Sequence, residues 1–333
     1  MACWARVGGM ARITQRDIAR LCGLDTSTIS RSLQGDERIL EATRARVVDA
    51  ARKLGYRPNL AARALVGGRA QVFWFVAASV GATADWRTTH ALSHATESTD
   101  YDLFVALHGN DEARYGRLLA RLAQGLVDGA VVLPRRHVSD ERILREITLR
   151  DYPLVFVDNW VEGLPVPTVT TDNDAGSRLL VRHCVAADAG AFVLLYGGDN
   201  PVVRERTAAA RSEIAALGAA LVEPVWADGG WHDRAPWPEG PLAILASSQE
   251  TVLGYCRDRA ERLAERRVVA GCFDEWRGEP QPADRVFVAP QDHESIARLA
   301  IDTLVRRIEQ PDQPVERRVA VPAMTIEEVV PRF

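Results

Sequence analysis

Several residues of this chain have types and spacings that could perform chemistry. His90 and His94 lie one helical turn apart and Glu97 lies one turn further along, so three metal ligands are conceivable. The H-E-x-x-H signature is absent and no further ligand is spaced nearby, which favours a solvated helix face over a metal site. Ser247 and Ser248 lack the G-x-S-x-G context of a hydrolase nucleophile. The sequence therefore predicts no catalytic centre, no metal and no cofactor.

A second group of polar residues follows apolar segments that read as buried strands. Three residues come shortly after such a segment: Asp158, Ser248 and Asp274. Ligands of open parallel sheets bind beyond the carboxyl ends of the strands, so these positions are candidates for a binding site. Arg204 and Arg206 begin an expected helix, where the helix dipole does not favour cations. Either they are surface charges, or they point into a cleft and hold a polar or anionic ligand.

The charge of the chain is divided unevenly along its length. The 333 residues carry 41 Lys and Arg against 45 Asp and Glu, a net charge of −4 at pH 7. Residues 10–69 hold 12 bases and 6 acids, a net charge of +6, whereas the residues from Ala70 onward carry −11. A basic head on an acidic body predicts that the head meets phosphate and that the body does not. The alternative is a basic helical domain whose charged faces are merely solvated.

Length and composition are those of an ordinary globular protein with two or three domains. Apolar residues make up 47% and charged residues 26%, which excludes a mostly disordered or fibrous chain. The apolar run near 72–80 is too short to cross a bilayer, and the first ten residues lack a secretory core. Five cysteines without a C-x-x-C pair are typical of a reduced protein. We therefore expect a cytoplasmic protein without a membrane partner.

The basic head begins with two short helices joined by a tight turn. Thr14 with Asp17 is typical of a capping box, and Gly23 suits the left-handed turn that ends the first helix. Asp25 caps a second helix over 26–33. Two short helices around such a turn predict a helix-turn-helix.

A third helix is expected over 41–54. Its apolar face at helical spacing is Ala45, Val48, Ala51 and Leu54. The helix stops at Gly55, and Pro58 biases the chain towards extended geometry. Asn59 can then cap a short segment over 60–66 that precedes two glycines.

The body alternates apolar and amphipathic segments. Those that read as strands are 72–77, 103–106, 130–133, 154–157, 192–196, 242–246 and 268–273. Those that read as helices are 112–124, 140–150, 174–185, 204–217, 250–264 and 294–309. This alternation predicts an α/β body of doubly wound parallel sheets, and about 265 residues suffice for two lobes with separate cores.

Two spaced patterns in the head carry a family resemblance. They are Thr14-x-x-Asp17-Ile18-Ala19-x-x-Cys22-Gly23-Leu24-x-x-x-Thr28-Ile29-Ser30-Arg31 and Gly55-Tyr56-x-Pro58-Asn59-x-x-Ala62-x-x-Leu65. Together they resemble the lactose/galactose repressor family. The resemblance implies that Met10 is the natural start, with 1–9 an extension that has no role in the fold. It further implies a helix-turn-helix head over 10–58, a hinge helix and linker over 59–69, and a body over 70–333.

The resemblance also implies which head residues contact DNA. Thr26, Ser27 and Arg31 would face base edges in the major groove, and Thr28 and Ser30 would reach phosphates. In the hinge helix, the matching positions are Asn59, Ala62 and Leu65, and Leu65 would be a wedge pushed between base pairs in the minor groove. Two departures stand out: Leu40 occupies the usual Ser or Thr cap position, and Asp25 replaces a serine.

For the body, the resemblance implies two lobes like those of a periplasmic sugar-binding protein, with chain crossings near 171, 291 and 321. Arg206 would bind sugar hydroxyls, Asp158 and Asp274 would accept them, and Trp231 would stack on the sugar. The family commonly has an Asn-Asp or similar pair where this chain has Ser248-Gln249. The short loops look like the fructose-responsive branch, in which Arg204 and Arg206 would meet a phosphate.

These observations predict a sequence-specific DNA-binding regulator, a repressor by family resemblance, that a sugar or sugar phosphate controls. A homodimer on a pseudo-palindromic operator is expected, because one head makes a small interface. After Val321 no leucine heptad favours a tetramer. A regulator of this kind works in the bacterial cytoplasm, on the nucleoid. The alternative function is a sugar-processing α/β enzyme with an appended DNA-binding anchor.

Overall fold

The computed structural model of the protein describes residues 13–56, 69–81, 83–134, 138–196, 200–227, 230–233, 236–277, 283–323 and 325–329. The chain divides into two compact units, Met1–Ala70 and Gln71–Phe333. We call them the head and the body and describe each by itself.

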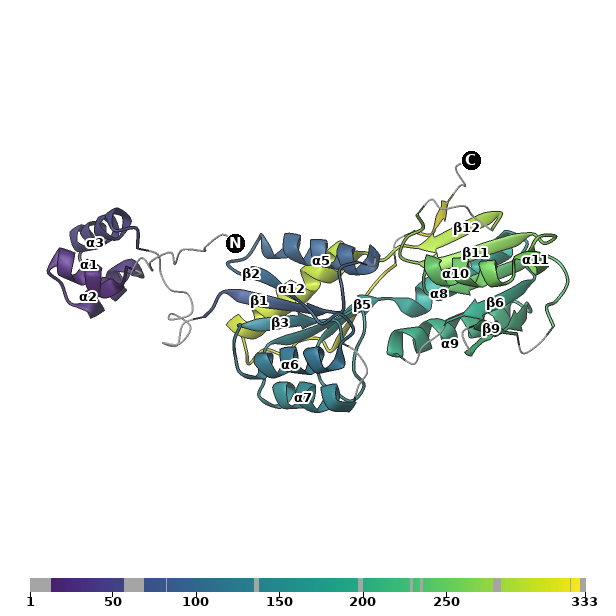
Figure 1. The fold of residues 1–333 in the computed structure, drawn as a ribbon, viewed down its shortest axis with the longest axis horizontal. Coiled ribbons are helices and arrows are strands. Elements are labelled where there is room, and N and C mark those ends of the chain that lie inside the picture. Colours follow the sequence, from purple (N-terminus) through teal and green to yellow (C-terminus); the bar gives the residue numbers. More distant parts are fainter. Residues whose placement is uncertain are drawn as a thin grey trace, which may run out of the picture. The chain divides into compact units, whose positions relative to one another are not determined.

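The head is all-helical, with α1 (Gln15–Cys22), α2 (Thr26–Leu33) and α3 (Glu41–Lys53) around one small core (Figure 1). Ile18, Ile29 and Val47 are fully buried in that core, one from each helix. The predicted apolar face of the third helix is confirmed at Ala51 and Leu54, which belong to the core or pack against it, and is wrong at Ala45 and Val48, which are exposed. Val47, Ala50 and Ala51 form the buried side of α3, whereas Val48 is 42% exposed.

The predicted ends of the first two helices are confirmed. Thr14 and Asp17 form a complete capping box, with the Thr14 amide 2.9 Å from the Asp17 carboxylate. Gly23 has φ of 62°, a left-handed conformation that glycine adopts without a steric penalty, and it ends α1. Leu40 precedes α3 without any side-chain cap, as the departure at this position predicts.

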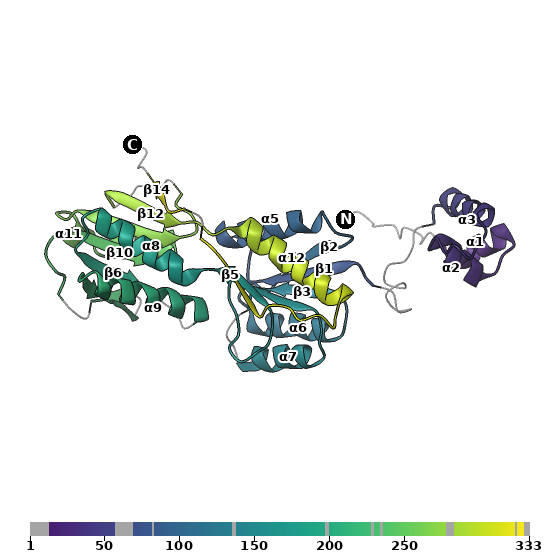
Figure 2. The same ribbon diagram turned by 180° about the vertical axis from the view of Figure 1, so that it is seen from behind.

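The body contains two lobes, each a six-stranded sheet with helices on both faces (Figures 1 and 2). The strand order of lobe 1 is β13-β5-β4-β3-β1-β2, and all its pairings are parallel. Its strands are β1 (Val72–Ala77), β2 (Asp102–Leu107), β3 (Gly129–Val132), β4 (Leu154–Val157), β5 (Thr168–Thr171) and β13 (Arg318–Val321). Helices α5 (Thr83–Thr96) and α12 (His293–Glu309) cover one face, and α6 (Glu112–Ala123) and α7 (Val138–Leu149) cover the other.

Lobe 2 repeats this architecture with the order β14-β12-β11-β10-β6-β7, in which only the β12–β14 pairing is antiparallel. Its strands are β6 (Ala191–Leu195), β7 (Ala220–Val222), β10 (Leu242–Ala246), β11 (Val268–Phe273), β12 (Arg285–Ala289) and β14 (Glu327–Val329). Its helices are α8 (Asn173–Ala186), α9 (Pro201–Ala216), α10 (Gln249–Asp258) and α11 (Ala260–Leu263), and a small hairpin joins β8 (Val225–Ala227) to β9 (Gly230–His232).

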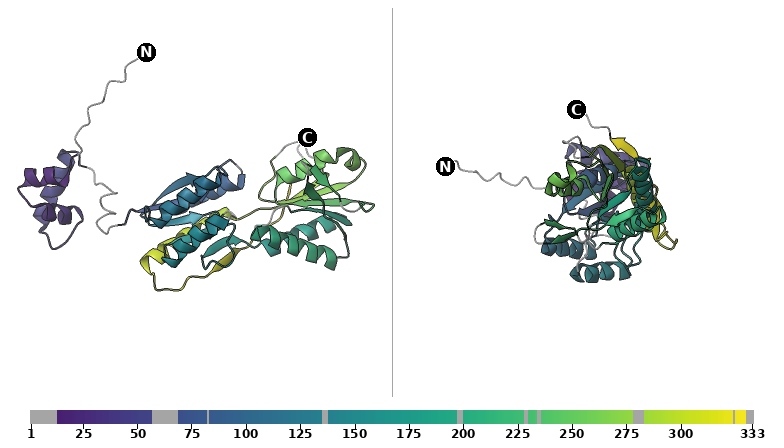
Figure 3. Two further views of the ribbon diagram at one scale, coloured as in Figure 1. Left: turned by 60° about the horizontal axis from the view of Figure 1, so that its bottom comes forward. Right: turned by 90° about the vertical axis from the view of Figure 1, so that its right-hand side faces the viewer.

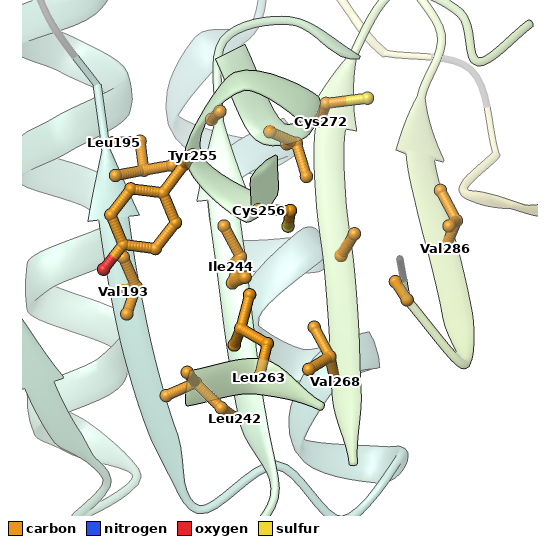
Figure 4. Close-up of a cluster of buried hydrophobic side chains, with 14 of the residues drawn as sticks. Val193, Leu195, Leu242, Ile244, Tyr255, Cys256, Leu263, Val268, Cys272 and Val286 are labelled. Atoms are coloured by element: carbon orange, nitrogen blue, oxygen red, sulfur yellow. The ribbon is translucent and has the colours of Figure 1, made fainter. Parts of the chain in front are cut away.

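Each sheet separates two layers of apolar side chains. In lobe 2 the α8 and α9 layer lies on one face, and the α10 and α11 layer lies on the other. Figure 4 shows the latter layer, in which Val193, Ile244 and Tyr255 pack between the sheet and α10. The predicted α/β, doubly wound fold of the body is therefore confirmed.

The chain passes between the lobes three times, and Figure 3 shows the connecting segments between the two sheets. It leaves β5 of lobe 1 for α8 of lobe 2 after Thr171, and it returns from β12 to α12 around Gln291. The third passage runs from β13 to β14 after Val321. In the part of the chain that the structure describes, no helix is both long and apolar enough to cross a membrane.

The structure differs from the predicted elements of the body at several places. The helix expected over 250–264 is interrupted at Arg259, which separates α10 from α11. The strands β5 and β12, which the sequence did not predict, lead into the first two lobe crossings.

Candidate functional site

The exposed side of α2 is the first candidate site. Ile29 and Ser32 are buried on its inner side, so the helical period turns Thr26, Ser27 and Arg31 to solvent. Thr28 and Ser30 are half-buried beside them. None of the ion pairs between described residues involves Arg31. A cationic fork with short hydroxyls around it is suited to close approach to base edges and phosphates.

Asp25 organises the start of this helix. Its carboxylate accepts hydrogen bonds from the backbone amides of Ser27 at 2.8 Å and Thr28 at 3.0 Å, and from both hydroxyls. The hydroxyl of Thr28 donates at 2.7 Å. These bonds hold the pKa of Asp25 well below its usual range, and the hydrogen bonds from the two hydroxyls have the largest effect. The cap predicted at Asp25 is confirmed, and it engages two of the residues expected at the DNA.

The hinge residues predicted to reach the minor groove, Asn59, Ala62 and Leu65, lie outside the described residues, as do the extension 1–9 and most of the linker.

The second candidate site lies at the carboxyl ends of the strands of the body. Asp158 follows β4 and Asp274 follows β11, and both have left-handed backbone, with φ of 62° and 73°. Burial raises the pKa of Asp158 to about 6 against the opposing effect of Arg206, and the Asp274 and Asp85 carboxylates raise it further. Three carboxylates therefore share one region of the body.

Arg206 is the buried cation of this region, at 5% exposure. Its Nε donates a hydrogen bond of 2.8 Å to Oδ1 of Asn173, and its guanidinium lies 3.6 Å from the ring centroid of Phe273. The ring and the amide fix the orientation of the guanidinium before any ligand arrives. Such a preorganised fork can donate to a ligand oxygen at little entropic cost.

Several buried polar atoms at the same strand ends lack a hydrogen-bond partner. Among the described residues, these include Oδ1 of Asn159, Oγ of Ser247 and Nε2 of His293. They come after β4, after β10 and at the start of α12. Buried polar groups are normally paired, so unpaired ones gathered at one edge indicate a place where a ligand or water supplies the missing bonds.

Asp85 completes the region from α5. It accepts a hydrogen bond of 2.9 Å from the hydroxyl of Ser79, and burial raises its pKa, with a further contribution from Asp274. The sequence analysis did not single out Asp85, Asn173 or His293. The only signal for the last two was an Asp immediately before each of them, at a helix start.

Three predicted effector residues make their contacts with residues outside this cluster. Arg204 is paired with Glu162, with Nη2 and Oε1 2.5 Å apart. Trp231 packs edge-on against Tyr255, which is two turns into α10, with ring centroids 5.7 Å apart. Ser248 caps α10 by accepting from the amide of Thr251 at 3.4 Å. The structure thus brings together Asp158, Arg206 and Asp274 only.

The conceivable metal ligands on α5 do not converge. The rings of His90 and His94 are stacked 6.5 Å apart, and His94 lies 3.9 Å from Glu97 and 3.8 Å from Glu294. Throughout the described ranges, no group of three or more His, Cys, Asp or Glu side chains could hold a metal ion.

Comparisons with known proteins bear on both sites. Residues 14–59 match the family described as bacterial regulatory proteins, lacI family. The transcriptional regulator PtxS of Pseudomonas aeruginosa is 27% identical over 95% of this chain and 94% of its own length. PtxS of Pseudomonas putida is 31% identical, but over 53% of this chain and 51% of its own length.

Two solved structures show the same fold. One is the Lac repressor dimer bound to operator and the anti-inducer ONPF, with a TM-score of 0.73 and 19% identity over 95% of this chain and 98% of that one. The other is a complex of the transcriptional regulator CelR with cellobiose, with a TM-score of 0.62 and 20% identity over 96% and 99%. The head is therefore a DNA-binding domain of the lacI family, as the resemblance predicts, and the relatives that the whole chain matches are transcriptional regulators rather than enzymes.

Proposed function

We propose that the chain is a repressor that binds a pseudo-palindromic operator as a homodimer, and that a small molecule bound between the two lobes changes its operator affinity. The observation that carries the DNA-binding part is the exposed Thr26, Ser27 and Arg31 side of α2, on a head that matches the lacI family. Because binding free energies are linked, operator and effector must alter each other's affinity by the same factor.

In the proposed complex, Thr26, Ser27 and Arg31 meet base edges, and Thr28 and Ser30 meet phosphates. Arg31 is suited to a bidentate contact with guanine. The hydroxyl proton of Thr28 is donated to Asp25 in this structure, so it must turn away to donate to a phosphate. The same proposal assigns Asn59, Ala62 and Leu65 to the minor groove, with Leu65 as the wedge that kinks the operator.

The proposed effector is a neutral sugar. Asp158 and Asp274 offer acceptors to hydroxyl protons, and Arg206 donates to hydroxyl oxygens. Three carboxylates lie in this region beside one buried arginine, and Arg204 is already paired with Glu162. That balance of charge disfavours a phosphorylated sugar, because a phosphate would meet like charge.

The proposed dimer would use the free edge of lobe 1. Strand β2 is the last strand of its sheet, and it exposes Phe104 at 56% and Val105 at 42%. Beside it, α5 exposes Trp86 at 53%. An unpaired edge with exposed apolar side chains invites a second strand, and a two-fold related copy would supply it. Replacing Phe104 with Asp should then lower the dimer fraction in sedimentation equilibrium.

The test of the proposed function has a DNA arm and an effector arm. The full chain would first select binding sites from random duplex DNA, and a pseudo-palindrome should emerge. Thermal shift would then screen glucose, fructose, ribose, maltose, sucrose, cellobiose and two fructose phosphates, because a bound ligand raises apparent stability. Enrichment of no site would contradict the repressor proposal. Binding of a fructose phosphate but of no neutral sugar would contradict the proposed effector. A protein of this function would act in the cytoplasm, on the nucleoid.

A further inference from the structure

The two lobes are repeats of one unit, and their equivalent positions can be read from the strand order. When β1 is matched to β6, the strand order matches β4 to β11 and β5 to β12. Helix α5 of lobe 1 then matches α9 of lobe 2, and α8 of lobe 2 matches α12 of lobe 1. Asp158 and Asp274 are then equivalent, and both have left-handed backbone. Asn173 and His293 are also equivalent, since each is the first residue of its helix after an Asp cap.

A weak sequence repeat supports this match. The caps and first two turns of α8 and α12 have identical or like residues at equivalent positions, namely Asp172 with Asp292, Asp174 with Glu294, Arg178 with Arg298 and Leu179 with Leu299. The equivalence therefore extends along the first two turns of the helices that begin where the chain crosses between lobes.

Both first residues bond to the neighbouring helix in the same way. Asn173 accepts from Nε of Arg206, the sixth residue of α9, at 2.8 Å. His293 pairs through Nδ1 with the hydroxyl of Thr88, the sixth residue of α5, at 3.0 Å. Lobe 2 thus holds its effector-binding arginine with Asn173, and lobe 1 has His293 and Thr88 at the matching place.

The two pairs differ in what they leave unbonded. The side-chain amide of Asn173 also donates to the carbonyl of Thr171 at 3.0 Å, so both ends of this side chain are used. His293 is only 8% exposed, and its Nε2 has no partner among the described residues. Because Nδ1 is held by Thr88, Nε2 lies on the other edge of the ring. The charged groups that act on His293 are Asp274 from lobe 2, Arg87 from α5, and Asp292 and Glu294 beside it.

We propose that Nε2 of His293 is a hydrogen-bonding contact to the effector, supplied by lobe 1 opposite Arg206 of lobe 2. The proposal rests on the effector site of the preceding section. Burial lowers the pKa of His293, so the ring is neutral near pH 7 and carries one N–H. A hydroxyl can both donate and accept, so it satisfies Nε2 in either tautomer, which is the chemistry of a polyhydroxylated ligand.

The competing explanation is structural: His293 would serve only to join α12 to Thr88. Two amide variants separate these roles. In His293→Asn the amide stands where Nδ1 stood, so the bond to Thr88 is kept and the Nε2 edge is lost. In His293→Gln the amide stands where Nε2 stood, and the bond to Thr88 is lost. The first variant also gives both lobes the same residue at this position.

The first measurement is thermal unfolding of the full chain without ligand. Since Nε2 has no partner there, His293→Asn should melt within experimental error of the unchanged chain, whereas His293→Gln should melt lower. A loss of stability in His293→Asn as large as that in His293→Gln would overturn the proposal. This measurement needs no effector, so it tests the role of His293 even if no sugar of the panel binds. The absence of sugar binding would contradict the proposed effector class and would leave the result for His293 unaffected.

The second measurement is calorimetry with the neutral sugar of that panel that shifts the unchanged chain most. His293→Asn should weaken its binding at least about 10-fold, the loss typical of one hydrogen bond in a closed site, and His293→Gln should retain more affinity. Operator binding without sugar should be equal in all three proteins, which shows that the fold is intact. Equal sugar affinity in His293→Asn and the unchanged chain would overturn the proposal.

Discussion

The hydroxyl of Thr171 donates a hydrogen bond of 2.6 Å to Oε1 of Gln291, where two of the chain crossings between the lobes lie against each other. Both side chains are buried, and the amide of Gln291 donates in turn to the carboxylate of Asp274. The crossings are thus bonded to each other and to a carboxylate of the proposed effector site. A ligand that forms a hydrogen bond with Asp274 would therefore act directly on the junction of Thr171 and Gln291, about which the lobes would move.

We expect Gln291→Leu to weaken sugar binding by about 10-fold and to lower the free energy of unfolding by ~1–3 kcal/mol, because it removes a hydrogen-bond partner from the buried Thr171 hydroxyl and from the half-buried Asp274 carboxylate. Calorimetry and urea unfolding measure the two effects. Thr171→Val is the matched control, since it removes the hydrogen bond between the two crossings but keeps the hydrogen bond from Gln291 to Asp274. Sugar binding by Gln291→Leu at full strength would show that the junction and the site are not linked.

Asp158 should make the ligand-free chain less stable as the pH rises. Its pKa is raised to about 6 in the folded chain, so the folded state holds a proton that the unfolded state has released at lower pH, and stability falls from about pH 4 to about pH 6. Asp158→Asn cannot ionise and should escape this loss. We expect it to unfold at higher urea concentration than the unchanged chain above about pH 6, with a free energy of unfolding that is higher by on the order of 3 kcal/mol.

The comparison at acidic pH is the control for that variant. Near pH 4 both side chains are neutral in the folded state, so the two proteins should be almost equally stable. An advantage of Asp158→Asn that is the same at both pH values would mean that the amide packs better and that ionisation of Asp158 is not the cause. Sugar binding should fall in the variant above about pH 6, because the amide offers one acceptor oxygen where the ionised carboxylate offers two.

The fold was predictable where hydrophobicity alone decides it. Strands β1, β4, β10 and β11 are continuous apolar segments, and their bounds match the sequence analysis. Strand β5 was missed because its residues, TVTT, look polar. They are fully buried nonetheless, and the Thr170 hydroxyl donates to the carbonyl of Asp158 at 2.7 Å. The sequence does not show which threonine hydroxyls will find a hydrogen-bond partner inside the fold.

The same limit applies to α3 and to the body site. In α3 alanine and valine occur on more than one face, so spacing alone could not choose Val47 over Val48. In the body, the rule of strand ends found Asp158 and Asp274. Asn173 and His293 follow no apolar strand of that list, and they reach the region only because the chain crosses between the lobes at β5 and β12. Proximity created by a crossing is not visible from local sequence.

Arg31 should determine a single base pair of the operator. We expect Arg31→Ala to bind the selected operator about 10-fold more weakly or worse, and to lose preference at that base pair, since a bidentate contact to guanine is worth ~1–3 kcal/mol of discrimination. Fluorescence anisotropy on the operator and its single-base variants measures this. Arg16 is the matched control, because it is exposed on α1, so Arg16→Ala should reduce affinity equally for all the sequences, if at all. A uniform loss in Arg31→Ala would place this side chain on a phosphate.

Arg318 and Glu205 join the two lobes by a bidentate ion pair, with Nη1–Oε1 and Nη2–Oε2 distances of 2.6 and 2.5 Å, and Arg318 lies 4.0 Å from the ring centroid of Trp160. Reversing one charge should loosen the lobes. A half-exposed pair of this kind is worth about 1 kcal/mol, so sugar binding, which needs contacts from both lobes, should weaken by about 5-fold in Glu205→Arg or Arg318→Glu. The effect should shrink at high salt.

The double reversal should recover most of the lost affinity, because it restores the pair in the opposite sense. Arg285 and Glu328 provide the matched control: they form a similar bidentate pair, with bonds of 2.6 and 2.8 Å, but both belong to lobe 2. Arg285→Glu should therefore lower thermal stability without a change in sugar affinity. Equal losses of affinity in Arg285→Glu and Arg318→Glu would mean that these pairs act on the stability of the body and not on the approach of its lobes.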